Sequence, residues 1–268
     1  MASSAAKASQ SRGRLIGPGD PSAIFVEGSA PAILGIHGFG GTPLEVGLVA
    51  DVARTLGRRA HLPLLPGHGT HADDLSRARW EDWTAAVEAA LDRISAPGEP
   101  CVVVGLSLGS LLATHLAVTH PERVSALVLL SNAFWLTAPF PAWALRAVDA
   151  LGLPDFRLPK VAADIADPNA RRTHLTYGEH PVHAAVAVER AGARMRSRLP
   201  DVQAPTLIVH GARDRVCPVA NADRVAARLG TRDVRVVVLP QSRHIVTRDL
   251  ERAAVAAELS RFLERFPS

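Results

Sequence analysis

Residues 101–119, CVVVGLSLGSLLATHLAVT, constrain the fold of this chain more than any other segment. The β-branched run Val102–Val104 predicts a strand, residues 105–109 form a tight turn, and a helical pattern of leucines follows. The turn reads G-x-S-x-G, a strand–turn–helix motif that holds Ser107 at a strained apex. Glycines are needed on both sides because the backbone presses close there. We therefore expect the Ser107 hydroxyl to stand above a sheet, beside the N-terminus of the next helix.

The same run is long and apolar, so a membrane-spanning helix is the first alternative to weigh. Polar residues and glycines interrupt it, at Gly105, Ser107, Gly109, Ser110, Thr114 and His115. We therefore predict no stable insertion into a membrane. The first residues, MASSAAKASQSRGR, are small and polar and lack the apolar centre of a signal peptide. They predict a disordered tail over residues 1–14 and a cytoplasmic protein.

The charge balance raises the question of a nucleic-acid partner. The 268 residues are enough for one large domain, the formal net charge is +4 and the pI is about 9.8. The arginines, however, are scattered along helical stretches, and the chain has neither zinc-finger spacing nor an aromatic-basic RNA motif. We predict no nucleic-acid partner, and the composition leaves the oligomeric state open.

No cluster of residues in the sequence predicts a cofactor or a metal. Cys101 and Cys217 make no disulfide framework, and packing roles fit both thiols. His68 and His71 lie near one another in a loop, but no nearby arrangement of carboxylates completes a metal site. We therefore predict that the protein uses no cofactor and holds no metal.

Strand patterns alternate with helical patterns along most of the chain. The expected strands are residues 22–27, 32–37, 60–65, 102–104, 124–130, 205–210 and 234–239. Helices are expected at residues 80–94, 220–229 and 247–266, after Ser107, and after Thr42, which fits an N-cap followed by Pro43. The alternation predicts an α/β fold on a mostly parallel, doubly wound sheet with helices on both faces.

Residues 133–200 break this alternation, because they hold short helical pieces interrupted by prolines and no convincing strand. We predict a helical cap over 133–200, inserted into a core formed by residues 15–132 and 201–268. Aromatic residues make up only 4% of the chain, yet four crowd the start of the cap, at Phe134, Trp135, Phe140 and Trp143. They predict the cap's own small core, an apolar pocket over Ser107, or both.

Three residue types suited to acyl transfer follow predicted strands. Ser107, Asp214 and His244 each lie just past such a strand, and the carboxyl ends of parallel strands share one edge of a sheet. A histidine can take the proton of a serine near neutral pH, and an aspartate can fix the tautomer of that histidine. The glycine loop at 37–41 follows another strand, so backbone N–H groups of Phe39 and Leu108 are expected to hold an oxyanion.

Each of these features also has an ordinary structural explanation. Asp214 fits the cap of a following helix, and His244 fits a loop histidine with satisfied ring nitrogens. The glycine loop resembles a phosphate cradle, but the Walker lysine and the G-x-G-x-x-G spacing are absent. His37 is a possible base, although a structural role at the end of its strand fits better. The joint placement at strand ends favours catalysis.

Several short segments of the sequence resemble those of a known family. HGFGG at 37–41, GLSLG at 105–109, D-R-V-C-P at 214–218 and S-R-H-I-V-T at 242–247 resemble α/β-hydrolase fold esterases. The segment LPGHGTHADDL at 65–75 and the S-x-H-x-x-T-x-D pattern ending at Asp249 are similar to bacterial monoacylglycerol lipases and carboxylesterases. The resemblance implies an α/β-hydrolase fold, a Ser107–Asp214–His244 triad, and oxyanion donors at Phe39 and Leu108. The chain departs at Ser110, where relatives usually carry glycine, and at Leu108, where many carry Met or Gln.

The leading hypothesis is therefore a serine hydrolase that cleaves short- to medium-chain carboxylic esters, including monoacylglycerols, as small-molecule substrates. Acyl transfer to an alcohol and a non-catalytic ligand receptor remain open alternatives on the same fold. Phe134, Trp135 and Phe140 are expected to line the acyl pocket, and Tyr177 and Glu179 are expected to contact the alcohol side of the substrate.

Overall fold

The centre of the fold is a seven-stranded sheet, described here in a computed structural model that covers residues 13–137, 151, 155–159 and 163–266. The strands lie in the order β11-β10-β6-β5-β3-β4-β2, and every neighbouring pair is parallel except β2 with β4. Their bounds are Ile24–Val26 (β2), Ser29–Ile36 (β3), Arg58–Leu62 (β4), Cys101–Leu106 (β5), Val124–Leu130 (β6), Thr206–Gly211 (β10) and Val234–Leu239 (β11). The predicted mostly parallel sheet is confirmed.

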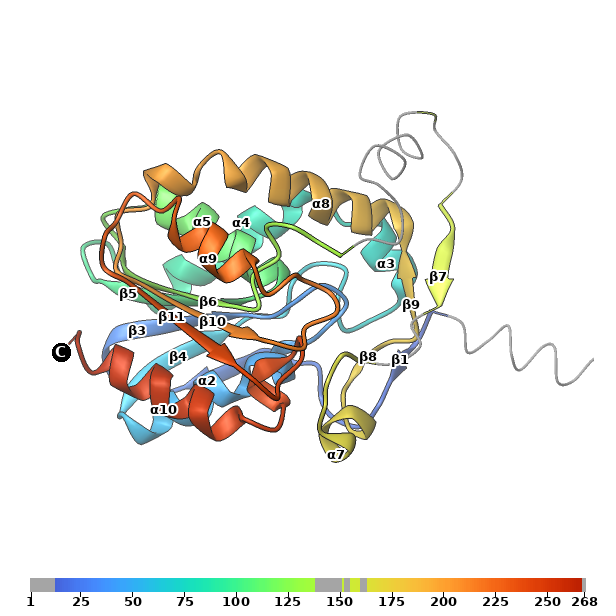
Figure 1. The fold of residues 1–268 in the computed structure, drawn as a ribbon, viewed down its shortest axis with the longest axis horizontal. Helices are drawn as coiled ribbons and strands as arrows, with labels where there is room; N and C mark the ends of the chain where they lie inside the picture. Colours follow the sequence, from blue (N-terminus) through green and yellow to red (C-terminus); the bar gives the residue numbers. More distant parts are fainter. Residues whose placement is uncertain (1–12, 138–150, 152–154, 160–162, 267–268) are drawn as a thin grey trace, which may run out of the picture.

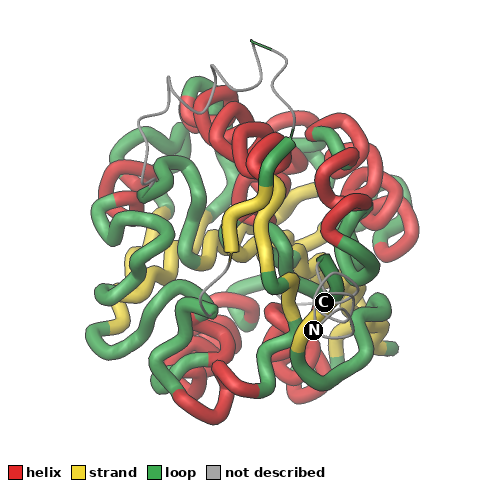
Figure 2. The backbone as a smooth tube through the Cα atoms, turned by 90° about the vertical axis from the view of Figure 1, so that its right-hand side faces the viewer, coloured by secondary structure: helices red, strands yellow, loops and turns green. Residues whose placement is uncertain are grey.

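Helices cover both faces of the sheet (Figures 1 and 2). One face carries α4 (Trp80–Ile94), α5 (Leu108–Thr119) and α9 (Asn221–Ala226), and the other carries α2 (Gly47–Thr55) and α10 (Arg252–Leu263). All six residues of β5 are buried, which explains why this strand is apolar throughout rather than alternating.

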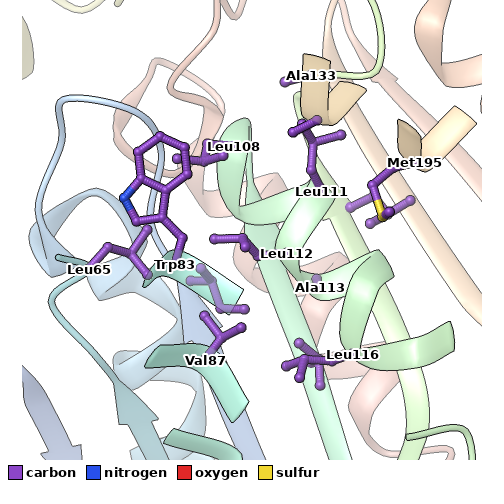
Figure 3. Packing of buried hydrophobic residues seen from close by; sticks show 14 of the residues in the cluster. Leu65, Trp83, Val87, Leu108, Leu111, Leu112, Ala113, Leu116, Ala133 and Met195 are labelled. Atoms are coloured by element: carbon purple, nitrogen blue, oxygen red, sulfur yellow. The ribbon is translucent and has the colours of Figure 1, made fainter. Parts of the chain in front are cut away.

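Trp83 anchors the packing between α4, α5 and the loop before α3 (Ala72–Arg77). Its side chain is fully buried and lies in one cluster with Leu65, Leu108 and Leu112 (Figure 3). The indole N–H donates a hydrogen bond to the carbonyl oxygen of Pro66 at 3.0 Å, so the polar atom of this large side chain is satisfied. The cluster therefore fixes the base of α5 and, with it, the turn that carries Ser107.

Helix boundaries differ from the predicted ones at several ends. Pro43 does open a helix, but it is the 3₁₀ turn η1 (Pro43–Val46), and the side chain of Thr42 makes no capping hydrogen bond. The helix predicted at 220–229 spans only α9. The last helix begins at Arg252 rather than 247, after the separate 3₁₀ turn η3 (Val246–Arg248).

Residues 133–200 contain α7 (Pro168–Arg172) and α8 (Val182–Arg196), and the 3₁₀ turn η2 (Leu199–Asp201) begins at the end of this range. They also contain strands, so the prediction of none was wrong: β7 (Arg157–Pro159) pairs with β9 (Glu179–Pro181), and β8 (Thr176–Tyr177) pairs with β1 (Leu15–Ile16). Strands of two or three residues are too short to produce a recognisable alternation. In Figure 1, α8 lies over α5, on the face opposite α10.

The chain is already ordered before β1. Gly13 and Arg14 were predicted to belong to the N-terminal tail, but Arg14 instead forms a β-bridge with His71, and the carbonyl of Gly13 accepts a hydrogen bond from the Ala72 N–H at 2.7 Å. Within the described ranges, no helix is long and apolar enough to cross a membrane.

Candidate active site

Ser107 occupies the sharp turn between β5 and α5. Its backbone has φ 53° and ψ −115°, a conformation that costs a non-glycine residue about 1–3 kcal/mol. A Cβ on Gly105 would lie 2.1 Å from the carbonyl oxygen of Gly109, and a Cβ on Gly109 would lie 2.2 Å from that of Ile36. The predicted close approach of backbone on both sides of the serine is confirmed.

Asp214 and His244 come from the loops that follow β10 and β11. His244 Nδ1 lies 2.8 Å from Asp214 Oδ2, and the side chains are 7% and 0% exposed respectively. The structure also brings Ser107 and His244 to the wall of one pocket. The Cys217 Sγ lies within 4.8 Å of side-chain ligand atoms of both Asp214 and His244.

The Asp214 carboxylate is held in its charged form. Burial alone would raise its pKa, but the nearby charge of His244 and a hydrogen bond from His210 lower that pKa strongly. The N–H groups of Val216 and Cys217 both donate to Asp214 Oδ1 at 2.8 Å, so the second carboxylate oxygen is fixed by backbone. His210, whose Nε2 lies 3.2 Å from Asp214 Oδ2, is a neighbour that the sequence analysis missed.

The charge of Asp214 in turn controls the basicity of His244. Burial by itself would lower the pKa of His244, but the charge of the Asp214 carboxylate, its hydrogen bond to the ring and the nearby Cys217 together raise the pKa well above its usual 6.5. His244 is therefore a stronger base than a free imidazole, with Nδ1 engaged by the carboxylate.

The glycine loop at 37–41 runs from β3 toward η1 and borders the same pocket, because Gly38 and Phe39 both line it. The Gly38 N–H donates to Glu45 Oε2 at 3.0 Å, and the Thr176 hydroxyl donates to the carbonyl oxygen of Gly40 at 2.8 Å. Glu45 and Thr176 are residues that sequence reasoning missed, because nothing local in a sequence shows which loop a buried side chain supports.

Leu108 stands at the first position of α5, where a backbone N–H has no partner within the helix. Its side chain points away into the core and is fully buried (Figure 3). The structure thus places the two predicted oxyanion donors, the N–H groups of Phe39 and Leu108, in the loop and at the helix end that flank Ser107.

His37 has a structural role, as its position at the end of a strand predicts. It is fully buried; Nδ1 lies 2.9 Å from the carbonyl oxygen of Gly38, and Nε2 accepts a hydrogen bond from the Leu65 N–H at 3.1 Å. Burial also lowers the pKa of His68, to about 3, so this ring stays neutral. Both histidines hold loops together and neither lines the pocket.

The pocket at Ser107 is small and mostly apolar. Its volume is about 210 Å³, less than the ~300–1,000 Å³ of sites for drug-sized ligands. Its lining residues are Gly38, Phe39, Glu45, Ser107, Leu136, Ala163, Asp164, His174, His180, Ala185, Val188, Val216, His244 and Ile245. A larger cleft of about 760 Å³ lies between α8 and residues 76–81, at the end of α3 and the start of α4, but Ser107, Asp214 and His244 do not line it. The smaller pocket is therefore the candidate site.

Two of the three aromatic residues predicted to line the acyl pocket lie elsewhere. Phe134 is fully buried in the core, and the Trp135 ring lies beneath the guanidinium groups of Arg196, Arg224 and Arg228 at 5.2–5.7 Å from its centroid. Neither borders the pocket, and Phe140 falls outside the described residues. Trp135 makes cation–π contacts with these arginines instead of lining the pocket, and its position in the sequence does not show which of the two environments it occupies.

Tyr177 and Glu179 do not border the pocket either. The Tyr177 hydroxyl donates to the carbonyl oxygen of Gly67 at 2.9 Å and accepts from the Thr70 N–H at 3.1 Å, so both its functions are used within the fold. Glu179 forms an ion pair with Arg157. Aliphatic side chains from α8, Ala185 and Val188, take the place predicted for aromatic ones.

Asp214, Cys217 and His244 are the one group in the described part of the chain whose potential metal-ligating atoms lie within 4.8 Å of one another. A thiol must lose its proton to bind a metal, and burial raises the pKa of Cys217. The Asp214 carboxylate is already occupied by His244 and by backbone N–H groups. This donor set fits a hydrogen-bonded triad better than a metal centre.

Comparison with known proteins shows which family the sequence matches. The sequence model of the family described as "Serine aminopeptidase, S33" matches residues 29–251. The chain is 29% identical to the thermostable monoacylglycerol lipase of Bacillus sp. (strain H-257), over 91% of this chain and 93% of that one. It is 23% identical to a carboxylesterase of Bacillus subtilis (strain 168), over 91% of this chain and 97% of that one.

Solved structures give the same result for the fold. A structure from work on LipS and LipT, two metagenome-derived lipolytic enzymes, superimposes with a TM-score of 0.84 and 26% identity, over 92% of this chain and 98% of that one. The family match at residues 29–251 spans both the strands of the sheet and the range 133–200.

Proposed function

The chain belongs to the serine aminopeptidase S33 family and is a carboxylic ester hydrolase of the α/β-hydrolase fold, and from this premise we propose that it cleaves small monoesters through an acyl-enzyme on Ser107. The observation that carries the proposal is the pairing of a buried Asp214–His244 hydrogen bond with Ser107 on the wall of one small apolar pocket.

The proposed reaction has two halves. The Ser107 oxygen attacks the ester carbonyl carbon while His244 Nε2 takes the hydroxyl proton, and the tetrahedral intermediate collapses as His244 returns that proton to the departing alkoxide. A water molecule then attacks the acyl-enzyme with His244 again as base, which releases the carboxylic acid and restores Ser107. Asp214 keeps the Nδ1 proton in place and stabilises the imidazolium that forms in each half.

The oxyanion is proposed to bind the backbone N–H groups of Phe39 and Leu108. One such donor is worth about 3–4 kcal/mol of transition-state stabilisation in related chemistry. Because the donor at Leu108 is backbone, the departure from Met or Gln at this position leaves it in place. The hydrogen bonds from Gly38 to Glu45 and from Thr176 to Gly40 support the loop that presents Phe39.

We propose that the core spans 15–132 and 201–268 and that the cap spans 133–200, since pocket-lining Leu136, Ala185 and Val188 come from the latter range. A cavity of about 210 Å³ leaves room for one short or medium acyl chain but not for the several chains of a triacylglycerol. The proposed substrates are therefore short- to medium-chain monoesters, including monoacylglycerols, the class named for the Bacillus sp. relative.

Acyl-chain length is expected to control kcat/KM until the pocket is full. Each buried CH₂ contributes about 0.8 kcal/mol, so kcat/KM should rise by up to about fourfold per methylene and then level off. The test is an ester series from acetate to dodecanoate in wild type, Val188→Phe and Ala187→Phe. Val188→Phe should move the optimum to shorter chains, whereas Ala187→Phe, which borders the larger cleft on the other face of α8, should leave it unchanged. A flat series, or triacylglycerol as the better substrate, would contradict the proposal.

The raised pKa of His244 predicts the pH dependence of activity. Since His244 must be unprotonated to act as base, kcat/KM should fall on the acidic side with a midpoint above pH 6.5. The sign for stability is opposite: the folded protein holds the proton more tightly, so this stabilisation is present below about pH 6.5 and is lost as pH rises through the folded-state pKa. The kinetic pH profile of the wild type measures the first effect, and thermal-unfolding profiles of wild type and His244→Gln measure the second; an acidic midpoint below pH 6.5 would contradict the assignment.

A further inference from the structure

We propose that Asp249 positions the catalytic histidine, an inference that rests on the proposed function. The sequence pattern S-x-H-x-x-T-x-D ends at this residue, and the reaction gives it no role. Its side chain is 1% exposed and lies outside the pocket lining, so it touches neither substrate nor reacting atoms. Asp249 is therefore a positioning residue, if its contacts lead to His244.

The Asp249 carboxylate accepts hydrogen bonds from four backbone N–H groups. Arg243 donates to Oδ2 at 2.7 Å; Ala166 donates to both oxygens at 2.9 and 3.0 Å; Asp167 and Leu250 donate to Oδ1 at 2.9 and 2.8 Å. Arg243 immediately precedes His244. One carboxylate thus joins residues 166–167 to the loop that follows β11 and carries His244 (residues 240–245, here called the base loop), although the two segments lie about 80 positions apart along the chain.

Residues 164–167, here called the strap, also contact the catalytic loops directly. The carbonyl oxygen of Asp164 accepts hydrogen bonds from the His244 N–H at 3.1 Å and the Ile245 N–H at 3.3 Å. The Asp164 side chain accepts one from the Arg215 N–H, next to Asp214, at 2.9 Å. The strap therefore bridges the base loop and the loop that follows β10 and carries Asp214 (residues 212–220, here called the acid loop). The hydrogen bonds to Asp249 hold the strap in place.

The 3₁₀ turn η3 sets the directions of the threonine and the aspartate that follow the histidine. It directs Thr247 toward η1, where its hydroxyl donates to the carbonyl oxygen of Glu45, and Asp249 toward the strap. The two side chains fasten opposite sides of the base loop. Without the Asp249 carboxylate, the N–H group of Arg243 and those of the strap would lose their shared hydrogen-bond acceptor. The base loop would then no longer be held at a fixed distance from Asp214.

The expected effect of mispositioning is specific to the leaving group. His244 must protonate a departing alkoxide, but 4-nitrophenolate leaves without a proton. A displaced His244 therefore harms acylation by an alkyl ester more than acylation by a 4-nitrophenyl ester, whereas a reduced folded fraction lowers both equally. General acid–base catalysis contributes about 10²–10⁴-fold, which sets the range available for loss.

Asp249→Asn tests the inference, because the amide keeps the size of the carboxylate and presents an N–H₂ group to backbone donors. We expect kcat/KM to fall about 100-fold for an alkyl ester and about tenfold for the 4-nitrophenyl ester with the same acyl group. Asp51→Asn, at an exposed carboxylate paired with Arg54, controls for charge. Leu259→Ala, at a fully buried position of α10, controls for lost stability and should leave the ratio of the two rates unchanged.

Labelling of Ser107 by a fluorophosphonate separates this inference from the proposed function. A wild-type protein that is labelled but turns over no ester would contradict the proposed substrate, and slower labelling of Asp249→Asn than of both controls would still support positioning. The positioning role would be overturned if the ratio of kcat/KM for the alkyl ester to kcat/KM for the 4-nitrophenyl ester were unchanged in Asp249→Asn. It would also be overturned if that ratio fell by the same factor in Leu259→Ala. An unlabelled wild-type protein would overturn both proposals.

Discussion

Ser107→Ala is expected to lower kcat for ester hydrolysis by about 10⁶, the loss typical of removing a triad nucleophile. Without the hydroxyl there is no acyl-enzyme, and the oxyanion donors and pocket alone give little acceleration. The fold should persist, because the alanine keeps the Cβ and the hydrogen bonds around the turn are made by backbone atoms and by the Ser110 hydroxyl. Initial rates with a 4-nitrophenyl ester and the thermal midpoint of unfolding measure the two halves of this prediction.

Covalent labelling identifies the nucleophile independently of rate. A fluorophosphonate should modify Ser107 in the wild type and leave Ser107→Ala unmodified, as read by peptide mass spectrometry. Ser110 and Ser242 are the informative alternatives, since both lie close in sequence to residues of the site. A label on either of them, with Ser107 unmodified, would show that the nucleophile is wrongly assigned.

Asp214→Asn is expected to lower kcat by about 10⁴ while the fold is retained. The amide has no charge to stabilise an imidazolium, and an Nδ2 hydrogen facing His244 forces the wrong tautomer on the ring. The 2.8 Å contact between Asp214 Oδ2 and His244 Nδ1 is the interaction that is lost. The acidic limb of the kcat/KM profile should also move to lower pH, because the group that raises the pKa of His244 is gone.

Asp233→Asn is the matched control for this charge change. Asp233 lies just before β11, is 45% exposed and pairs with Arg265 on the surface, where such pairs are worth about 0–1 kcal/mol. Its replacement should change neither kcat nor the pH profile. A large loss of kcat in Asp233→Asn, with Asp214→Asn fully active, would mean that the acid of the triad lies before β11 and not after β10.

The core was predictable from sequence because its signals are local. The run Val124–Leu130 is apolar throughout since both faces of the sheet are covered, and α4 begins and ends where its helical pattern does. The turn at Ser107 follows from its glycines. Once strands are located, the parallel topology itself places the residues that follow them at one edge, which is why Asp214 and His244 could be paired without any contact information.

The residues of the cap could not be assigned in the same way. Trp135 and Phe134 follow β6 as an aromatic pair, but one lies under three arginines and the other in the core, so their directions are set by elements distant in sequence. Tyr177 was predicted to contact the substrate, but its hydroxyl is hydrogen-bonded to the backbone of Gly67 and Thr70. The side chains that line the pocket, such as Val188, resemble those of any amphipathic helix.

Buried polar partners were equally invisible to sequence reasoning. Thr42 occupies the expected cap position without using its side chain, whereas Thr176 and Thr247 donate to carbonyl oxygens more than 100 residues away. Such hydrogen bonds depend on which distant segments the fold brings together, and the residue spacing within one segment does not predict this. Residue type alone identified polar positions but not their partners.

The strap has a consequence for chimeras built between relatives. A donor insert that replaced residues 133–200 as one block would replace with it the carbonyl oxygen that accepts from His244 and the N–H groups that reach Asp249. For recombination, residues 164–167 thus belong to the recipient, although they lie inside the inserted range. Junctions drawn before Asp164 and after Asp167 exchange the other pocket-lining residues of 133–200 and leave the recipient's own contacts to the acid and base loops intact.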